Sequence, residues 1–255
     1  MQIGIIGYKG FVGSAFFEVF SKDAKCEVTG IEKGNLEACK GMQFDLLINA
    51  NGNSSKRLAD TDPMKDFEAN VLSSADFLHS FKYAHYVHIS TIEVYNSRTD
   101  ARLTSEDAPI NPQELSNYGF SKYLGELVVK THAKSWLIVR LAGMVGANMK
   151  KGPAFDILNL RKLFISERSK FLFMNTKTVA QTVKKLVEKG KWNEIYNVAG
   201  KGNIELSEFA KIAKISLVQT GKDVQCFDIN VSKLEKEMHV PTSREAIEEF
   251  IKTSQ

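Results

Sequence analysis

Apolar runs and amphipathic stretches alternate along residues 1–141 of the chain. Residues 1–7 form a short apolar run that ends in a glycine, which is typical of a buried parallel strand. The apolar positions that follow recur at i, i+3, i+4, i+7 and i+8, so they share the core-facing side of a helix. These positions are Val12, Ala15, Phe16, Val19 and Phe20.

The same patterns predict the other elements. Strands are expected at residues 26–32, 44–50, 83–90, 136–141 and 194–199, and helices at residues 64–82, 118–130, 175–190, 205–215 and 243–252. Strands that alternate with helices indicate an α/β protein with a doubly wound parallel sheet. The alternation loosens after about residue 143, and we expect this tail to cover a ligand at the C-terminal edge of the sheet.

Composition and charge narrow the function classes. Apolar residues make up 43% of the 255 residues and charged residues 25%, as in ordinary soluble globular proteins. The net charge of +4 is too mild to indicate nucleic acid, and it suits anionic small molecules such as dinucleotides and sugar nucleotides. No run is apolar enough for a membrane span, and no signal peptide is expected. Three scattered cysteines without metal-ligand spacing suggest a reducing cytoplasm and no metal site.

Three glycines connect the first predicted strand to the first predicted helix. Gly7, Gly10 and Gly13 permit a tight turn, a close approach of the backbone to a pyrophosphate, and close helix–sheet packing. The N-terminus of the following helix then faces the phosphates. The sequence therefore predicts a dinucleotide-binding turn.

The end of the second predicted strand bears on the choice of dinucleotide. Glu32 stands where a carboxylate binds the adenosine ribose hydroxyls and repels a 2′-phosphate, although it could instead be a solvated acid. Lys9 and Lys33 lie nearby in sequence and would attract a 2′-phosphate. The cofactor is therefore NAD or NADP, and the sequence leaves both open.

Tyr118 and Lys122 are the strongest candidates for chemistry. Side chains four apart on a helix are neighbours, so the phenol and the ammonium share a face. An adjacent ammonium favours the phenolate and would lower the pKa of Tyr118 from its ordinary value of about 10. The pair is therefore expected to supply a tuned proton donor or acceptor.

Several motifs in a fixed order resemble the extended short-chain dehydrogenase/reductases of the NAD-dependent epimerase/dehydratase family. The resemblance reaches from residue 1 to about residue 200. It rests on the glycine turn, Asn70-Val71, Ile89-Ser-Thr-Ile-Glu-Val-Tyr95, Glu106-Asp-Ala-Pro-Ile-Asn-Pro112, Tyr118-Gly-Phe-Ser-Lys122, Arg140-Leu-Ala-Gly-Met-Val-Gly146 and Tyr196-Asn-Val-Ala-Gly200.

The resemblance implies a Rossmann-type doubly wound sheet and assigns roles to particular residues. Thr91 would orient the reacting oxygen, Tyr118 would exchange the proton, and Lys122 would also hold the nicotinamide ribose. The implied cofactor-binding residues are Gly7, Lys9, Gly10, Phe11, Val12, Gly13, Glu32, Asn49, Ala50, Asn51, Ser90, Tyr118 and Lys122.

Departures from the family pattern narrow the range of reactions and substrates that the resemblance implies. The stretch around Ile92 resembles a motif of sugar-nucleotide dehydratases in which an aspartic acid precedes a glutamic acid. Ile92 stands in place of that aspartic acid, and its side chain cannot donate a proton. The glutamic acid is present as Glu93. Gly143 replaces the usual asparagine that contacts the substrate diphosphate, which weakens the assignment to nucleotide sugars. Only residues 33–44 separate Glu32 from Asp45, so a smaller sheet is expected.

The leading hypothesis is a reductase that uses NAD(P)H to reduce a keto group of a nucleotide-linked or related sugar. The alternative among enzymes is a nucleotide-sugar 4-epimerase, which uses the same residues and retains its NAD. The alternative from another class is a non-catalytic NAD(P)-binding sensor or scaffold.

Domain boundaries and partners complete the expectations. A cofactor-binding domain is expected at residues 1–142 with part of 175–200, and a small substrate-binding region at 143–174 and 200–255. Candidate substrate contacts are Glu93, Arg98 and Arg161. By resemblance, we expect a homodimer through the helices near residues 66–82 and 118–130.

Overall fold

The structure is a computed structural model that describes residues 1–218 and 220–253. Its residue contacts divide the chain into two compact units. The first unit comprises residues 1–96, 109–140 and 180–196, and the second comprises residues 97–108, 141–179 and 197–255. Residue 219 and residues 254–255 of the predicted substrate-binding region lie outside the described residues.

A six-stranded sheet in the order β2-β1-β3-β4-β5-β9 is the core of the first unit. The registers of β1 with β2, β1 with β3, and β3 with β4 are parallel. The strands are β1 (Gln2–Ile6), β2 (Glu27–Ile31), β3 (Gln43–Asn49), β4 (Lys82–Thr91), β5 (Trp136–Leu141) and β9 (Glu194–Val198). Crossover connections of this kind place helices on the faces of the sheet.

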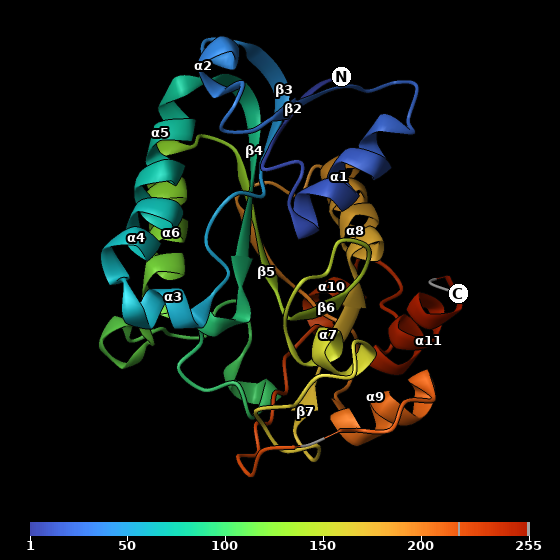
Figure 1. Cartoon of the computed structure of the whole chain (residues 1–255). Helices are drawn as coiled ribbons and strands as arrows, with labels where there is room; N and C mark the ends of the chain where they lie inside the picture. Colours follow the sequence, from blue (N-terminus) through green and yellow to red (C-terminus); the bar gives the residue numbers. More distant parts are fainter. Residues whose placement is uncertain (219, 254–255) are drawn as a thin grey trace. The chain divides into compact units, whose positions relative to one another are not determined.

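Figure 1 shows α5 and α6 on one face of this sheet and α1 and α8 on the other. The inward sides of the helices bury aromatic and aliphatic residues such as Phe16, Phe20 and Phe77. The helices of this part of the chain are α1 (Phe11–Ser21), α2 (Leu36–Cys39), α3 (Lys56–Thr61), α4 (Pro63–Phe67), α5 (Ser73–Ser80), α6 (Asn117–His132) and α8 (Thr176–Glu188). The predicted Rossmann-type doubly wound parallel sheet is confirmed.

The stretch predicted as one helix at residues 64–82 is divided into three parts. A π-helical turn at Glu68–Leu72 separates α4 from α5, and the side chain of Asp62 caps α4. π turns within helices often occur at functional sites, because the extra residue redirects the side chains around it. Two short 3-10 helices, η2 (Ile92–Val94) and η4 (Pro112–Glu114), also belong to this unit.

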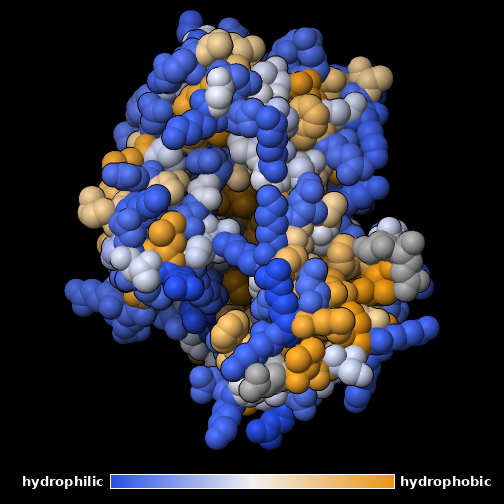
Figure 2. All heavy atoms as spheres, viewed as in Figure 1, coloured by the Kyte–Doolittle hydropathy of each residue, from blue (hydrophilic) through white to orange (hydrophobic). Residues whose placement is uncertain are grey.

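The second unit has its own apolar cluster, which includes Val145, Phe173 and Phe209. Figure 2 shows hydrophobic side chains at the lower right of the viewed face, in the region of α9. Its elements are η3 (Ala101–Leu103), β6 (Gly143–Val145), α7 (Pro153–Leu158), β7 (Lys170–Phe171), β8 (Phe173–Asn175), β10 (Ile204–Glu205), α9 (Leu206–Ala213), α10 (Ser232–Glu235) and α11 (Ser243–Thr253). Short two-stranded pairings, β6 with β8 and β7 with β10, replace a large sheet here.

No helix within the described residues is long and apolar enough to cross a membrane.

Candidate active site

The glycine turn lies at the carboxyl end of β1. Gly7 adopts a φ of +77°, and its N–H donates to Ile31 O over 2.8 Å. A Cβ on Gly13 would lie 2.1 Å from Gly7 O, so a side chain there would collide with the turn. The turn is therefore a bare backbone cradle in front of the N-terminus of α1, and it fits the phosphates of a dinucleotide.

Lys9 and Glu32 face each other beside this turn. Lys9 Nζ lies 2.5 Å from Glu32 Oε1, and the contact raises the pKa of Lys9 chiefly through this hydrogen bond. The Tyr8 ring packs against Gly30, whose Cβ would lie 2.6 Å from the ring. The acid and the base proposed to select between NAD and NADP thus lie in one ion pair.

The end of β3 continues the same edge of the sheet. Asn49 Oδ1 accepts a hydrogen bond from Asn51 N–H over 3.0 Å, and Ala50 N–H donates to Ile6 O over 3.0 Å. A Cβ on Gly7 would lie 3.0 Å from Asn51 N, so this segment passes close to the glycine turn. The predicted cofactor residues of β1 and β3 therefore lie together at the carboxyl ends of neighbouring strands, where ligands of such sheets bind.

Thr91 and Tyr118 meet in the structure. Thr91 ends β4, Tyr118 lies in the first turn of α6, and their hydroxyl groups share a hydrogen bond. Gly119 makes this approach possible, because a Cβ there would lie 2.4 Å from Glu93 O. Both Thr91 and Tyr118 expose only 8% of their surface, so both side chains are shielded from bulk solvent.

The expected lowering of the pKa of Tyr118 is wrong for this structure. Burial is the largest effect, and it raises the pKa well above the ordinary value. The hydrogen bond from Thr91 opposes that rise, whereas the charges of Glu93 and Asp66 add to it. Tyr118 is therefore held as a neutral phenol, the form that can give up a proton.

Lys122 lies one turn beyond Tyr118 and exposes 5% of its surface. Its Nζ donates to Ile89 O over 2.7 Å. Burial lowers the pKa of Lys122 to about 8, while the charges of Glu126 and Asp66 oppose that lowering. The ammonium is thus poised to lose its proton not far above neutral pH.

Glu126 is a second buried charged residue of α6, and it connects this helix to β4 and β5. Glu126 accepts a hydrogen bond from Ser90 Oγ over 2.6 Å and two from Arg140 over 2.9 and 2.7 Å. Arg140 also lies 4.8 Å from the centre of the Tyr95 ring. Ser90, predicted to contact the cofactor, is therefore hydrogen-bonded to Glu126, and this contact ties β4 to α6.

The candidate substrate residues divide between the two units. Glu93 is buried in the first unit, and its Oε1 lies 2.7 Å from Lys56 Nζ. Arg98 and Arg161 belong to the second unit, where each guanidinium lies over an aromatic ring, Phe227 for Arg98 and Phe155 for Arg161. All three remain predictions as substrate contacts.

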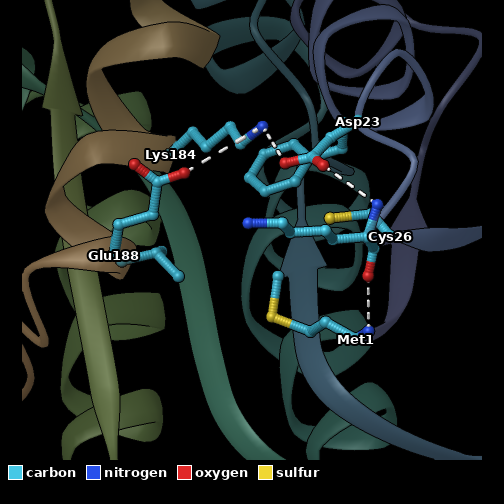
Figure 3. A pocket seen from close by; sticks show the side chains of 8 residues that line it. Met1, Asp23, Cys26, Lys184 and Glu188 are labelled. Atoms are coloured by element: carbon cyan, nitrogen blue, oxygen red, sulfur yellow. Dashed lines mark hydrogen bonds and ion pairs between the residues drawn. The ribbon is translucent and has the colours of Figure 1, made fainter.

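A pocket of about 380 Å³ lies at the opposite edge of the first unit's sheet. Figure 3 shows Lys184 beside Asp23, with Met1 and Cys26 at the amino-terminal starts of β1 and β2. Lys184 Nζ lies 2.5 Å from Asp23 Oδ2. Because ligands of such sheets bind at the carboxyl ends of the strands, this pocket is not part of the candidate active site.

Sequence reasoning missed several buried polar residues around the site. Glu126 carries a signal that could have been used, since Tyr118, Lys122 and Glu126 follow one another at intervals of four on one helix face. Asp66 gives no such signal, because it stands between polar and apolar residues in a stretch that resembles an ordinary surface helix.

The chain belongs to the family described as the RmlD substrate binding domain, whose model matches residues 1–230. This membership confirms the resemblance to NAD(P)-dependent epimerases and reductases. Among curated proteins, the chain is similar to UDP-glucose 4-epimerase from Mycoplasma genitalium, with 24% identity over 214 residues. That match covers 68% of this chain and 63% of the epimerase, so the chain spans less than two thirds of that relative's length.

Solved structures share the fold over essentially the whole chain. UDP-glucuronic acid 4-epimerase from Bacillus cereus, in complex with UDP-glucuronic acid and NAD, has a TM-score of 0.81 at 20% identity and 100% coverage of both chains. dTDP-4-dehydrorhamnose reductase from Bacillus anthracis, in complex with NADP, has a TM-score of 0.80 at 17% identity, covering 100% of this chain and 99% of that chain.

Proposed function

We propose that this protein is an NAD(P)-dependent oxidoreductase that reduces a keto group of a nucleotide-linked or related sugar. The observation that carries the proposal is the Thr91–Tyr118 hydrogen bond beside buried Lys122. Family membership and the similarity to a dTDP-4-dehydrorhamnose reductase support it. Ile92 supports reduction over dehydration, because its side chain has no proton to donate.

The residues of the first unit have separable tasks in this proposal. Gly7, Gly10 and Gly13 would hold the pyrophosphate of the cofactor against the start of α1, and Lys122 would hold the nicotinamide ribose. The bound dinucleotide would supply the hydride. Thr91 would orient the carbonyl oxygen, and the Tyr118 hydroxyl would donate the proton that this oxygen needs.

An epimerase remains the second candidate, and its support is the similarity to two 4-epimerases. It would use the same hydroxyl groups and return the hydride to the sugar, so the cofactor would not be consumed. The binding-only alternative requires Tyr118 and Lys122 to be without chemical effect.

A turnover screen separates these functions. The full chain is incubated with 4-keto sugar nucleotides in the presence of NADH or NADPH, and separately with UDP-sugars in the presence of NAD. The reductase predicts stoichiometric loss of absorbance at 340 nm together with a reduced sugar. Interconversion of UDP-sugars with NAD and without net formation of NADH would replace the reductase with the epimerase, and cofactor binding without any conversion would favour the sensor.

Further proposals concern domains, assembly and location. The first unit would bind the cofactor, and the second, which holds Arg98 and Arg161, would bind the substrate. A homodimer through α5, α6 and the π turn is supported by exposed apolar side chains there, Leu72 at 52%, Phe120 at 38% and Leu127 at 38%. The three free cysteines support a cytoplasmic location.

A further inference from the structure

Asp66 on α4 is an acidic side chain with no exposed surface. A buried carboxylate is costly unless hydrogen bonds or a charge partner compensate for its lost hydration. Its Oδ1 accepts hydrogen bonds from Asn53 Nδ2 over 2.6 Å and from Asn70 Nδ2 over 2.8 Å. Its Oδ2 makes no hydrogen bond within the described part of the chain.

The two amides that hold Asp66 belong to different segments of the first unit. Asn53 lies in the loop that follows the cofactor-edge residues of β3, and its Nδ2 also donates to Ser55 O over 2.9 Å. Asn70 lies in the π turn, and a Cβ on neighbouring Gly52 would lie 2.6 Å from Asn70 Oδ1. One carboxylate oxygen therefore fastens the cofactor-edge loop to the π turn.

The π turn in turn lies against the helix of the catalytic pair. A Cβ on Gly125 of α6 would lie 2.9 Å from Asn70 O and 3.4 Å from His88 Nε2. α4 and the π turn both pack against α6. The charge of Asp66 acts on both members of the pair, raising the pKa of Lys122 and that of Tyr118.

The other acid near Lys122 is Glu126, whose charge raises the pKa of Lys122 more than that of Asp66 does, and which also has a cation of its own. Glu126 is held by two hydrogen bonds from Arg140. Among the described residues, the other buried ionisable groups of this unit include His88 on β4, whose pKa burial and then Lys122 lower, Tyr86 on β4, whose pKa burial raises, and Glu93, which pairs with Lys56. The other charged or ionisable residues of α3, α4, the π turn and α5 are exposed, namely Arg57, Asp60, Lys65, Glu68, Asp76 and His79.

We propose that Asp66 is a positioning residue for the Tyr118–Lys122 pair: its Oδ1 fixes the Asn53 loop to the π turn, and its carboxylate supplies a second buried countercharge for the Lys122 ammonium, beside that of Glu126. The role rests on the proposed function of Lys122 and deepens it. Without this countercharge the ammonium would lose its proton at a lower pH, and its grip on an anionic or hydroxyl-rich ligand would weaken.

The test measures the titration of Lys122 without substrate or cofactor. Lysine labelled with ¹³C at Cε is incorporated into the full chain, and the Lys122 signal is assigned by its loss in Lys122→Met. The expected midpoint in the unchanged protein is about 8. In Asp66→Asn the midpoint falls by roughly one pH unit, as expected for the loss of a nearby opposite charge.

Matched variants separate the effect of the Asp66 charge from the effect of the packing of its side chain. Asp76→Asn removes an exposed carboxylate from α5, so its expected Lys122 midpoint equals that of the unchanged protein. Asp66→Glu keeps the charge and is expected to keep the midpoint within a few tenths of a pH unit. If Asp66→Asn does not fold, Asp66→Leu gives the same reading, because it replaces the carboxylate with an apolar side chain of similar length.

A midpoint in Asp66→Asn or Asp66→Leu equal to that of the unchanged protein overturns the proposal. This outcome is distinct from failure of the proposed function, since the titration needs no turnover. If a keto sugar is reduced, the alkaline limb of kcat/KM is expected to move to lower pH by the same amount as the Lys122 midpoint. A purely structural role for Asp66 would change the thermal stability and leave both pH midpoints in place.

Discussion

Arg140 and Glu126 form a two-point ion pair inside the first unit, with 2.7 Å between Arg140 Nη2 and Glu126 Oε2 and 2.9 Å between Arg140 Nε and Glu126 Oε1. The two residues expose 1% and 0% of their surface. The pair joins β5 to α6 directly behind Lys122, and it also receives the Ser90 hydroxyl of β4. The geometry of α6, which carries Tyr118 and Lys122, therefore depends on a buried charge pair.

Breaking this pair is expected to destabilise the fold strongly. Glu126→Gln leaves the Arg140 charge buried without its carboxylate, at a cost of about 3–5 kcal/mol in the free energy of unfolding. Urea titration followed by circular dichroism measures the change. The exposed Lys22–Glu18 pair provides the control, because Glu18→Gln is expected to unfold close to the unchanged protein. Equal effects in the two variants would contradict the structural role of the buried pair.

Removing the Tyr118 hydroxyl is expected to stop proton transfer while leaving the fold intact. Tyr118→Phe should lower turnover of an active keto sugar by about 10²–10⁴-fold, because a positioned proton donor contributes that much. Its NAD(P)H affinity should fall far less than its turnover, because Tyr118 is one of many expected cofactor contacts. Tyr123→Phe on the same helix is the matched control, since Tyr123 is only half-buried and lies outside the Thr91–Tyr118 contact. Activity of Tyr118→Phe equal to that of the control would remove the catalytic assignment.

The depressed pKa of Lys122 makes stability depend on pH in a defined window. Between its folded pKa of about 8 and its ordinary value of 10.5, the unfolded chain binds a proton at Lys122 that the folded chain does not. The contribution of Lys122 to the free energy of unfolding therefore rises with pH across this window. Below pH 8 the full penalty remains, on the order of 3 kcal/mol.

The contribution of Lys122 is measured as the difference in the free energy of unfolding between Lys122→Met and the unchanged protein. The variant should be more stable than the unchanged protein at pH 7, and the gap should close as pH approaches 10. Urea titrations at several pH values measure the gap. A gap that stays constant from pH 7 to pH 10 would mean that Lys122 does not titrate in this range.

The Lys9–Glu32 pair is expected to set the cofactor preference. Glu32→Gln frees Lys9 from its ion pair and removes a negative charge, so the affinity for NADPH relative to NADH should rise about tenfold. Lys9→Gln should shift the ratio in the opposite direction. Dissociation constants from cofactor fluorescence measure both. Lys22→Gln changes an exposed lysine at the other end of α1, where the ratio should not move.

Assembly can be tested through the exposed apolar residues of the first unit. Leu72→Glu and Leu127→Glu place charges on the proposed dimer face, so each should convert a dimer into a monomer. Light scattering after size exclusion measures the mass. Leu103→Glu changes a comparably exposed leucine of the second unit and should leave the mass unchanged. A monomeric unchanged protein would rule out the interface.

The parts of the fold that could be predicted from sequence are those with strong local periodicity. The strand–turn–helix around Gly7 and the helix with Tyr118 were both found, because apolar spacing and glycine placement determine them locally. The π turn at Glu68–Leu72 was not found, since one extra residue in a helical turn leaves no clear mark on the spacing of apolar residues.

Electrostatic properties were less predictable than the positions of residues. The spacing of Tyr118 and Lys122 was correct, but the direction of the pKa shift of Tyr118 was wrong. The spacing of two residues along a helix indicates that their charges lie close together. It does not show how far a side chain is removed from water, and this loss of hydration has the larger effect on the pKa of Tyr118. The burial of Asp66 depends on contacts with Asn53 and Asn70 that only the folded chain brings together.

The interleaved composition of the two units has a consequence for biosynthesis. The first unit needs residues 180–196, and the last strand of its sheet, β9, comes after residues that belong to the second unit. On the ribosome, the sheet can gain its sixth strand only when most of the chain has been translated. A truncation before residue 196 removes part of both units, and a truncation after residue 196 leaves the second unit incomplete. Residues 97–108 and 141–179 of the second unit are therefore already synthesised when the sheet of the first unit becomes complete.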